Sequence, residues 1–258
     1  LAYGTGLEHD SLAALLRDEH SRVAAPVPAP LPSPPHRPQP SISPALLPET
    51  VTASNHQHLI DCPYRYFAAD CLHLSPPDVI REELQKSDYG ERVHRCLEAF
   101  HSDVADLPGP FLQPFNAATR TAAVDLLRRI AAAVFARDIE DNFQHRGWLK
   151  RWQRLIPSYV DWQIARAQQW QVVQVEARVQ RELEAGVRLE GRLDRVDRAD
   201  GAQAVIDYKT GAIPAQADID AGEAVQLPMY ALLCAAQVAQ VDYVQLSVKR
   251  VKLSGGLA

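Results

Sequence analysis

The sequence has few cysteines, a single methionine and no excess of positive charge. Its four cysteines, Cys62, Cys71, Cys96 and Cys234, are scattered and lack the paired spacing of a zinc finger. The net charge of −5 excludes a strongly basic nucleic-acid-binding protein on composition alone. Because Met229 is the only methionine and the chain begins with leucine, we expect it to be a piece of a longer protein.

Three sequence patterns are also missing. The chain contains no run of 18 or more apolar residues and no signal peptide, so we expect a cytoplasmic protein without a membrane partner. It also lacks the pattern Gly-x-x-x-x-Gly-Lys-Ser/Thr, which excludes ATP hydrolysis by a P-loop within this chain.

A proline-rich stretch divides the sequence. Ten of the nineteen prolines fall between Pro26 and Pro48, which predicts an extended linker over 26–49. Residues 1–25, with a short helix predicted over 8–24, are expected to be the tail of a preceding domain or a docking helix. The remaining stretch, 50–258, is long enough to bury a sizeable core in one domain.

Asp200 and Gly201 stand between two runs of alternating polarity, which is a strong signal for a two-residue β-hairpin turn. In that register the numbers of paired residues sum to 401, so Asp194 is expected opposite Asp207. Opposed carboxylates repel each other unless a divalent cation lies between them. Lys209 shares the strand face of Asp207, where its ammonium suits phosphate chemistry. A solvent-exposed hairpin carrying an Asp–Lys pair is the alternative interpretation.

Hydrophobic periodicity predicts an α/β fold. Helices are expected over roughly 53–71, 87–101, 116–140, 147–169 and 223–237, and strands near 171–182, 187–197, 203–209 and 241–250. Three consecutive strands, a helical crossover and a fourth strand predict a mixed central sheet flanked by helices. The helical region from about 102 to 170 is expected to be an insertion packed on this core.

Several motifs occur in a characteristic order. Gly-Glu-Arg-Val-His spans 90–94, Gly-Arg-Leu-Asp-Arg-Val-Asp spans 191–197, Ile-Asp-Tyr-Lys-Thr-Gly spans 206–211 and Gln-Leu-Pro-Met-Tyr spans 226–230. With these motifs the sequence resembles the RecB-like nucleases of the PD-(D/E)XK superfamily. The segment 54–67 resembles the opening of the same domain, especially in AddB-type helicase-nuclease subunits.

The resemblance implies a restriction-endonuclease-like core with a catalytic metal site. Asp194 and Asp207 are the expected metal ligands, together with His94 and the backbone carbonyl of Tyr208. Lys209 is expected to orient the attacking water or to stabilise charge, so Asp194, Asp207 and Lys209 are the predicted catalytic residues. A neutral imidazole can bind a metal, although a satisfied core histidine is the alternative for His94.

Four further residues are expected to contact DNA or to support the site. Gln226 and Tyr230 lie four positions apart on one face of a predicted helix. The resemblance implies that these two residues position the DNA or the catalytic lysine. An ordinary amphipathic helix is the alternative interpretation. Glu176 is expected near the metal or DNA, with an exposed strand charge as the alternative. The hairpin register places Arg192 opposite Lys209, beside the predicted metal and phosphate. Arg65 and the basic residues of 249–252 are candidates for phosphate contacts. That they are solvated strand residues is an explanation nearly as good.

The resemblance also implies a Mg²⁺- or Mn²⁺-dependent DNA exonuclease in double-strand-break repair and recombination. Its expected partners are a DNA single strand or duplex end and a helicase subunit or fused helicase domain, which suggests association with the bacterial nucleoid. A structure-selective endonuclease or a CRISPR-adaptation-type nuclease of the same fold is one alternative. A non-catalytic scaffold subunit that binds DNA ends is another.

AddB-type relatives hold an iron–sulfur cluster with a cysteine in the Cys62 context and three more near the C-terminus. No cysteine follows Cys234 in this sequence. We therefore expect no iron–sulfur cluster, and we expect Cys62 to be a small buried residue.

Overall fold

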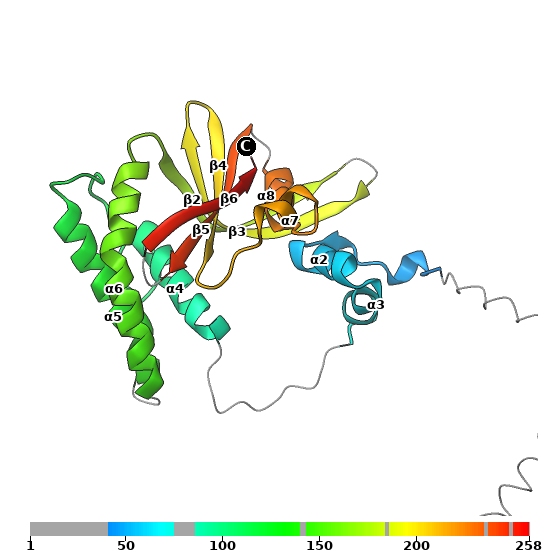
Figure 1. Cartoon of the computed structure of the whole chain (residues 1–258), viewed down its shortest axis with the longest axis horizontal. Helices are drawn as coiled ribbons and strands as arrows, with labels where there is room; N and C mark the ends of the chain where they lie inside the picture. The colour runs from blue at the N-terminus through cyan, green and yellow to red at the C-terminus, as the bar shows by residue number, and fades with distance from the viewer. Residues whose placement is uncertain are drawn as a thin grey trace, which may run out of the picture. The chain divides into compact units, whose positions relative to one another are not determined.

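The computed structural model describes residues 41–74, 86–139, 143–183, 186–234, 237–247 and 250–257. The chain divides into two units, Leu1–Ile42 and Ser43–Ala258, and every described helix and strand belongs to the second unit (Figure 1). The predicted tail over 1–25, with its helix, and the linker up to residue 40 lie outside the described residues.

The second unit contains helices and strands in the predicted order. The helices are α2 (Ala53–Asp61), α3 (Pro63–Tyr66), α4 (Lys86–His101), α5 (Arg120–Ile139), α6 (Phe143–Arg166), α7 (Gln216–Asp220) and α8 (Gln226–Leu233), with a 3₁₀ turn at Pro44–Leu46 and a π-helical turn at Phe67–Cys71. The strands are β1 (Thr50–Val51), β2 (Gln171–Glu182), β3 (Arg188–Ala199), β4 (Ala202–Lys209), β5 (Val238–Ser247) and β6 (Arg250–Leu257).

Two predictions of local structure are wrong. The helix expected over 53–71 is interrupted at Cys62, whose backbone is extended, because the ring of Pro63 disfavours a helical conformation for the preceding residue. The strand expected near 241–250 is two antiparallel strands, β5 and β6. The sequence signal for β6 is weak because its second half, 254–257, contains two glycines and a serine.

The sheet is mixed, as predicted. Its order is β1-β3-β4-β5-β6, with β2 paired to β3. β1 runs parallel to β3 and β4 parallel to β5, whereas the pairs β2–β3, β3–β4 and β5–β6 are antiparallel. The crossover from β4 to β5 passes through α7 and α8, because two parallel strands need a long connection, which is usually helical.

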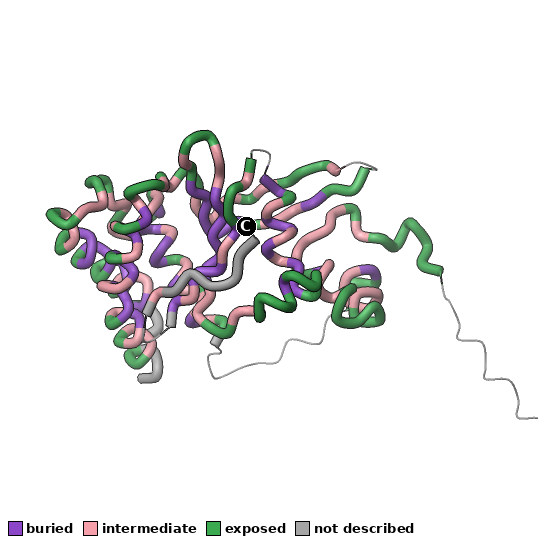
Figure 2. The backbone as a smooth tube through the Cα atoms, turned by 45° about the horizontal axis from the view of Figure 1, so that its top comes forward, coloured by how far each residue is buried: buried purple, intermediate pink, exposed green. Residues whose placement is uncertain are grey.

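Helices cover both faces of the sheet (Figure 1). On one face, α4, α5 and α6 form a core with Ile206, Tyr208 and Val244. On the other face, α7 and α8 pack against Val205 and Tyr243. Neighbouring residues of β4 therefore face opposite cores, as the period of two along a strand requires. Helices α5 and α6, expected to form an insertion, thus share one of the two layers with α4. Buried segments concentrate in this layer and in the central strands (Figure 2).

The hairpin register is confirmed. Asp200 and Gly201 have φ angles of 48° and 82°, as a type I′ turn requires. The pairs run from Ala199–Ala202 to Arg195–Ile206, and each pair sums to 401. Asp194 and Asp207 come one step beyond the last of these pairs.

Gly191 allows α8 to approach β3. β4 pairs with β3 at 195–199 and β1 pairs with it at 188–189. Gly191 lies between these two pairings, and a Cβ atom there would come within 2.5 Å of Leu233 Cδ1 and 3.6 Å of Tyr230 Cε1. A side chain at this position would therefore have to displace the buried side chain of Leu233 on α8.

Gly191→Val should lower the free energy of unfolding by about 1–3 kcal/mol, because the larger side chain overfills the contact between β3 and α8. Urea denaturation measures the change. Gly211→Val is the matched control, since a Cβ atom there meets nothing within 4 Å. Equal stability of the two valine variants would contradict the proposed contact.

Candidate active site

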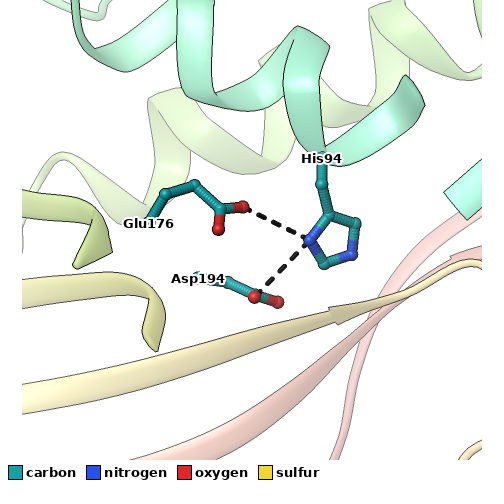
Figure 3. Close-up of side chains that lie close together, drawn as sticks. All are labelled: His94, Glu176 and Asp194. Atoms are coloured by element: carbon teal, nitrogen blue, oxygen red, sulfur yellow. Dashed lines mark ion pairs between the residues drawn. The ribbon is translucent and has the colours of Figure 1, made fainter. Parts of the chain in front are cut away.

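Side chains from α4, β2, β3 and β4 meet in a groove of about 920 Å³. His94 projects from α4 toward Glu176 on β2 and Asp194 on β3 (Figure 3). Gly90, one turn before His94, brings α4 close to the end of β4, because a Cβ atom there would lie 3.3 Å from Thr210 Oγ1. The groove therefore forms where α4 lies beside β2, β3 and the end of β4.

The strands part at Asp194. Its Oδ2 accepts a hydrogen bond of 2.7 Å from the backbone N–H of Tyr208, so a side chain continues the contact with β4 after the last ladder pair. Leu193 and Val196 both pack in the α8-side core, although strict alternation would place them on opposite faces. The alternation therefore slips by one residue at Asp194 and turns its carboxylate toward α4.

β2 is distorted at the same level. Glu176 has a φ of 49°, in the left-handed region that non-glycine residues rarely adopt. Its flanking residues pair regularly with β3, as Val175–Arg195 and Ala177–Leu193. Such strain persists only where the surrounding structure enforces it, and it is concentrated at functional sites.

The expected pairing of Arg192 with Lys209 does not form. The β3–β4 ladder ends at Arg195–Ile206, and Arg192 pairs instead with Arg178 of β2. Its Nε lies 2.6 Å from Glu176 Oε2, so Arg192 supports the carboxylate of Glu176. The Asp200–Gly201 turn sets the register of the hairpin. The slipped alternation at Asp194 then stops the β3–β4 pairing before it reaches Arg192.

His94 has two different environments at its two ring nitrogens. Nε2 lies 3.0 Å from the backbone carbonyl oxygen of Tyr208, to which only a protonated nitrogen can donate. This assigns the proton of a neutral ring to Nε2 and leaves a lone pair on Nδ1. Nδ1 lies 3.4 Å from Glu176 Oε1 and 3.5 Å from Asp194 Oδ1. A lone pair facing two carboxylates is repulsive unless a proton or a cation joins them.

The pKa values report this crowding. Burial lowers the pKa of His94, but its hydrogen bonds and charge interactions with Asp194 and Glu176 outweigh burial and raise the pKa to about 10. Burial and the charge of Asp194 raise the pKa of Asp207 to about 7, although Lys209 and His94 act in the opposite direction. The site thus favours an added positive charge near His94.

A metal ion would meet that requirement. Among the described residues, His94, Glu176 and Asp194 each offer one ligand atom, and these atoms all lie within 4.8 Å of one another. Carboxylate oxygens suit Mg²⁺ and Mn²⁺, and imidazole nitrogen is a common ligand of divalent transition metals. The donation from His94 Nε2 to Tyr208 is the kind of outer contact that fixes a metal-binding imidazole in orientation.

Lys209 and Asp207 form a second, adjoining group with α8. Lys209 Nζ lies 2.7 Å from Asp207 Oδ2 and donates to Gln226 Oε1 at 2.8 Å. Gln226 Nε2 donates to Asp207 Oδ1 at 2.7 Å and to Tyr230 Oη at 2.9 Å. The side-chain amide of Gln226 therefore hydrogen-bonds to both Lys209 and Asp207, and its contact with the Tyr230 hydroxyl fixes its orientation.

The structure assembles the predicted residues with two differences. Asp207, expected as a metal ligand, is only 2% exposed and contacts Lys209 and Gln226. Glu176, expected only to support the site, lies with His94 and Asp194 in the cluster of possible ligands. The Tyr208 carbonyl, expected to bind metal directly, accepts the hydrogen bond of His94.

A sequence model of the PD-(D/E)XK nuclease superfamily matches residues 50–255. The chain belongs to the PD-(D/E)XK nuclease superfamily. The mixed sheet between two helical layers agrees with the restriction-endonuclease-like fold of this superfamily. Membership implies a nuclease that uses divalent metal ions, and the cluster around His94 is the candidate site for one.

The chain is also similar to longer bacterial proteins. An uncharacterized protein from Rickettsia bellii (strain RML369-C) is 23% identical over 190 residues, and one from Rickettsia felis (strain ATCC VR-1525 / URRWXCal2) is 24% identical over 190 residues. Each alignment covers 72% of this chain but only 22% and 21% of these relatives. The chain thus spans about a fifth of their length.

A buried polar network between the sheet and α6, on the same face as α4, supports this candidate site. Arg195 is fully buried and donates to Asp197 Oδ1 and to Gln163 Oε1, both at 2.6 Å. It also donates to the hydroxyl of Tyr208 at 3.1 Å, and that hydroxyl lies 2.9 Å from the hydroxyl of Tyr159. Arg166 provides Asp197 with a second guanidinium. The side chain of Tyr208 is therefore fixed, and its backbone carries the contacts to His94 and Asp194.

This network was missed in the sequence. Arg195 and Asp197 belong to the Gly-Arg-Leu-Asp-Arg-Val-Asp motif, but charged residues on a strand are usually exposed. The one available signal is their spacing of two, which places both on the same face of a strand.

Three remaining sequence predictions concern other residues. Cys62 is exposed, so the prediction that it is buried is wrong; it lies at the break between α2 and α3. Arg65, on α3, is exposed, and Lys249 lies outside the described residues. None of the helices described is long and apolar enough to cross a bilayer.

Arg195→Met should lower the free energy of unfolding by about 3–5 kcal/mol, because it leaves buried Asp197 with Arg166 alone and removes the donor to Gln163 and Tyr208. Chemical denaturation measures this loss. Arg198→Met, at an exposed position of the same strand, should cost less than about 0.5 kcal/mol. Similar losses in both variants would show that the buried network does not stabilise the fold.

Proposed function

We propose that this domain is a Mg²⁺- or Mn²⁺-dependent deoxyribonuclease that hydrolyses DNA phosphodiester bonds as an exonuclease. One observation carries the proposal: a crowded donor set of His94, Glu176 and Asp194 adjoins an ammonium group, Lys209, that α8 holds in place. Anionic ligands beside a fixed cation suit a reaction in which negative charge develops on a phosphate.

The metal ion would be held by Asp194, Glu176 and Nδ1 of His94, with Asp207 as the adjoining carboxylate. When bound, it supplies positive charge for the scissile phosphate and lowers the pKa of a water nucleophile. Arg192 balances Glu176 at one of its two oxygens and leaves the other facing His94. The donor set is thus oriented before substrate arrives.

Lys209 would act on the substrate directly. Its Nζ is fixed by Asp207 and by Gln226, and its side chain remains 28% exposed beside the groove. In this place it can orient the attacking water by a hydrogen bond or stabilise the charge that develops on the phosphate oxygens. Gln226 and Tyr230 then act as positioning residues, because they set the direction of the ammonium group.

The wider role proposed is double-strand-break repair and recombination together with a helicase subunit or fused helicase domain. This part rests on the motif order and on the resemblance of 54–67 to AddB-type subunits. A structure-selective endonuclease or CRISPR-adaptation-type nuclease would use the same site. A non-catalytic scaffold is disfavoured, because the donor set and the lysine are both present.

Asp207→Ala and Lys209→Ala should each slow DNA hydrolysis by on the order of 10²-fold or more, because each removes a charge that acts in the transition state. The measurement is degradation of labelled linear DNA with Mg²⁺ or Mn²⁺. Asp103→Ala, on an exposed loop, is the control and should match the parent. Unchanged rates in both site variants would refute the assigned site, and cutting of circular DNA would favour an endonuclease.

Glu176→Gln should weaken Mn²⁺ binding by about tenfold or more, because it removes an anionic oxygen from the donor set but keeps the shape of the side chain. Isothermal titration calorimetry gives the Kd directly. Glu190→Gln on β3 is the matched control, since its carboxylate contacts Gln180 and not His94. Equal Kd values for the two variants would exclude Glu176 as a ligand.

A further inference from the structure

The outer helices carry positive charge that the net charge of the chain conceals. The whole chain has a net charge of −5. In contrast, α6 (Phe143–Arg166) contains five basic residues and one acidic residue, Asp161. Three of the basic residues, Arg146, Lys150 and Arg154, follow one another at intervals of four and are exposed. Residues four apart share one face of a helix, so they form a basic stripe along α6.

A groove between α5 and α6 runs beside this stripe. It has a volume of about 430 Å³ and is lined by Arg128 of α5 and by Lys150, Gln153, Arg154 and Pro157 of α6. Its lining contains three cations and no acidic residue. The carboxylate nearest to Arg128 is Asp125 on the same helix, 3.8 Å away, and both side chains are at least half exposed. Such an exposed pair neutralises little of the positive charge.

Both helices that line the basic groove also contact the active-site groove or a residue of its lining. Val134 of α5 lines the active-site groove, and Arg128 lies six residues earlier, about 9 Å along the helix axis. On α6, Arg151 donates at 3.4 Å to the backbone carbonyl of Thr210, which lines the active-site groove. Lys150, its neighbour in sequence, faces the basic groove. Helices α5 and α6 therefore connect the two grooves.

We propose that the groove of Arg128, Lys150 and Arg154 binds the phosphodiester backbone of the DNA substrate away from the scissile bond. This inference rests on the proposed function, which supplies a polyanionic substrate to the adjacent groove. Lysine and arginine side chains that contact phosphates provide most of the sequence-independent affinity for DNA. Gln153 adds a neutral hydrogen-bonding group to the same surface. The groove thus holds the strand while the metal site cuts it.

The test is the affinity of the 258-residue chain for a fluorescein-labelled oligothymidine, measured by anisotropy in EDTA so that no cleavage occurs. Lys150→Glu/Arg154→Glu is compared with Arg188→Glu/Arg198→Glu. The control pair makes the same change in net charge at exposed positions near the two ends of β3. We expect the groove variant to bind at least about tenfold more weakly, with the slope of log Kd against log salt reduced by about 1.4 for two lost contacts.

Three outcomes would overturn the inference. They are parental affinity in the groove variant, equal weakening in both double variants, and no binding of the oligonucleotide by the parent. Parental affinity would instead leave the groove to an acidic protein partner. Hydrolysis is assayed separately on the same proteins with Mn²⁺. A parent that binds through the groove but cuts no DNA would refute the proposed function and leave the groove assignment intact.

Discussion

The carboxylate of Asp194 is the constraint on which the site depends. One of its oxygens accepts the backbone N–H of Tyr208 and so replaces a strand contact at the end of the β3–β4 ladder. The other oxygen faces Nδ1 of His94. Because this single group both ends a β-ladder and faces the imidazole, the strands open only where the donor set forms. An apolar residue in its place could do neither.

Tyr208 joins the candidate site to a buried polar network on the α4–α6 face of the sheet. Its backbone N–H and carbonyl bind Asp194 and His94, while its side chain enters the buried network of Arg195, Asp197 and Tyr159. A fully buried guanidinium is costly to desolvate, and it is tolerated here because its partners are preformed. The network stabilises the conformation of β4 from the face opposite α8, which holds Lys209. The two residues that follow Asp207 in the sequence are thus anchored from both sides of the sheet.

Charge is distributed unevenly in this domain. Acidic groups crowd the site around His94 and favour a cation, and burial together with the charge of Asp194 raises the pKa of Asp207. Basic groups lie on the outer surface of α5 and α6, at the edge of the same helical layer. The net charge of −5 therefore does not predict how the molecule binds a polyanion, because its acidic and basic groups lie on different parts of the surface.

The sequence by itself determined the local geometry. The Asp200–Gly201 turn fixes the hairpin register, and the spacing of Gln226 and Tyr230 places both on one helix face, because both features depend only on the period of the backbone. Alternation and helix periodicity likewise predicted the mixed sheet and most helices. Only the tertiary structure decided that Glu176 joins His94 and Asp194, since a positive φ and a slipped alternation arise from packing. The same holds for the burial of Arg195 and for the meeting of Arg128 with Lys150: contacts between distant segments depend on how layers pack, which no local period encodes.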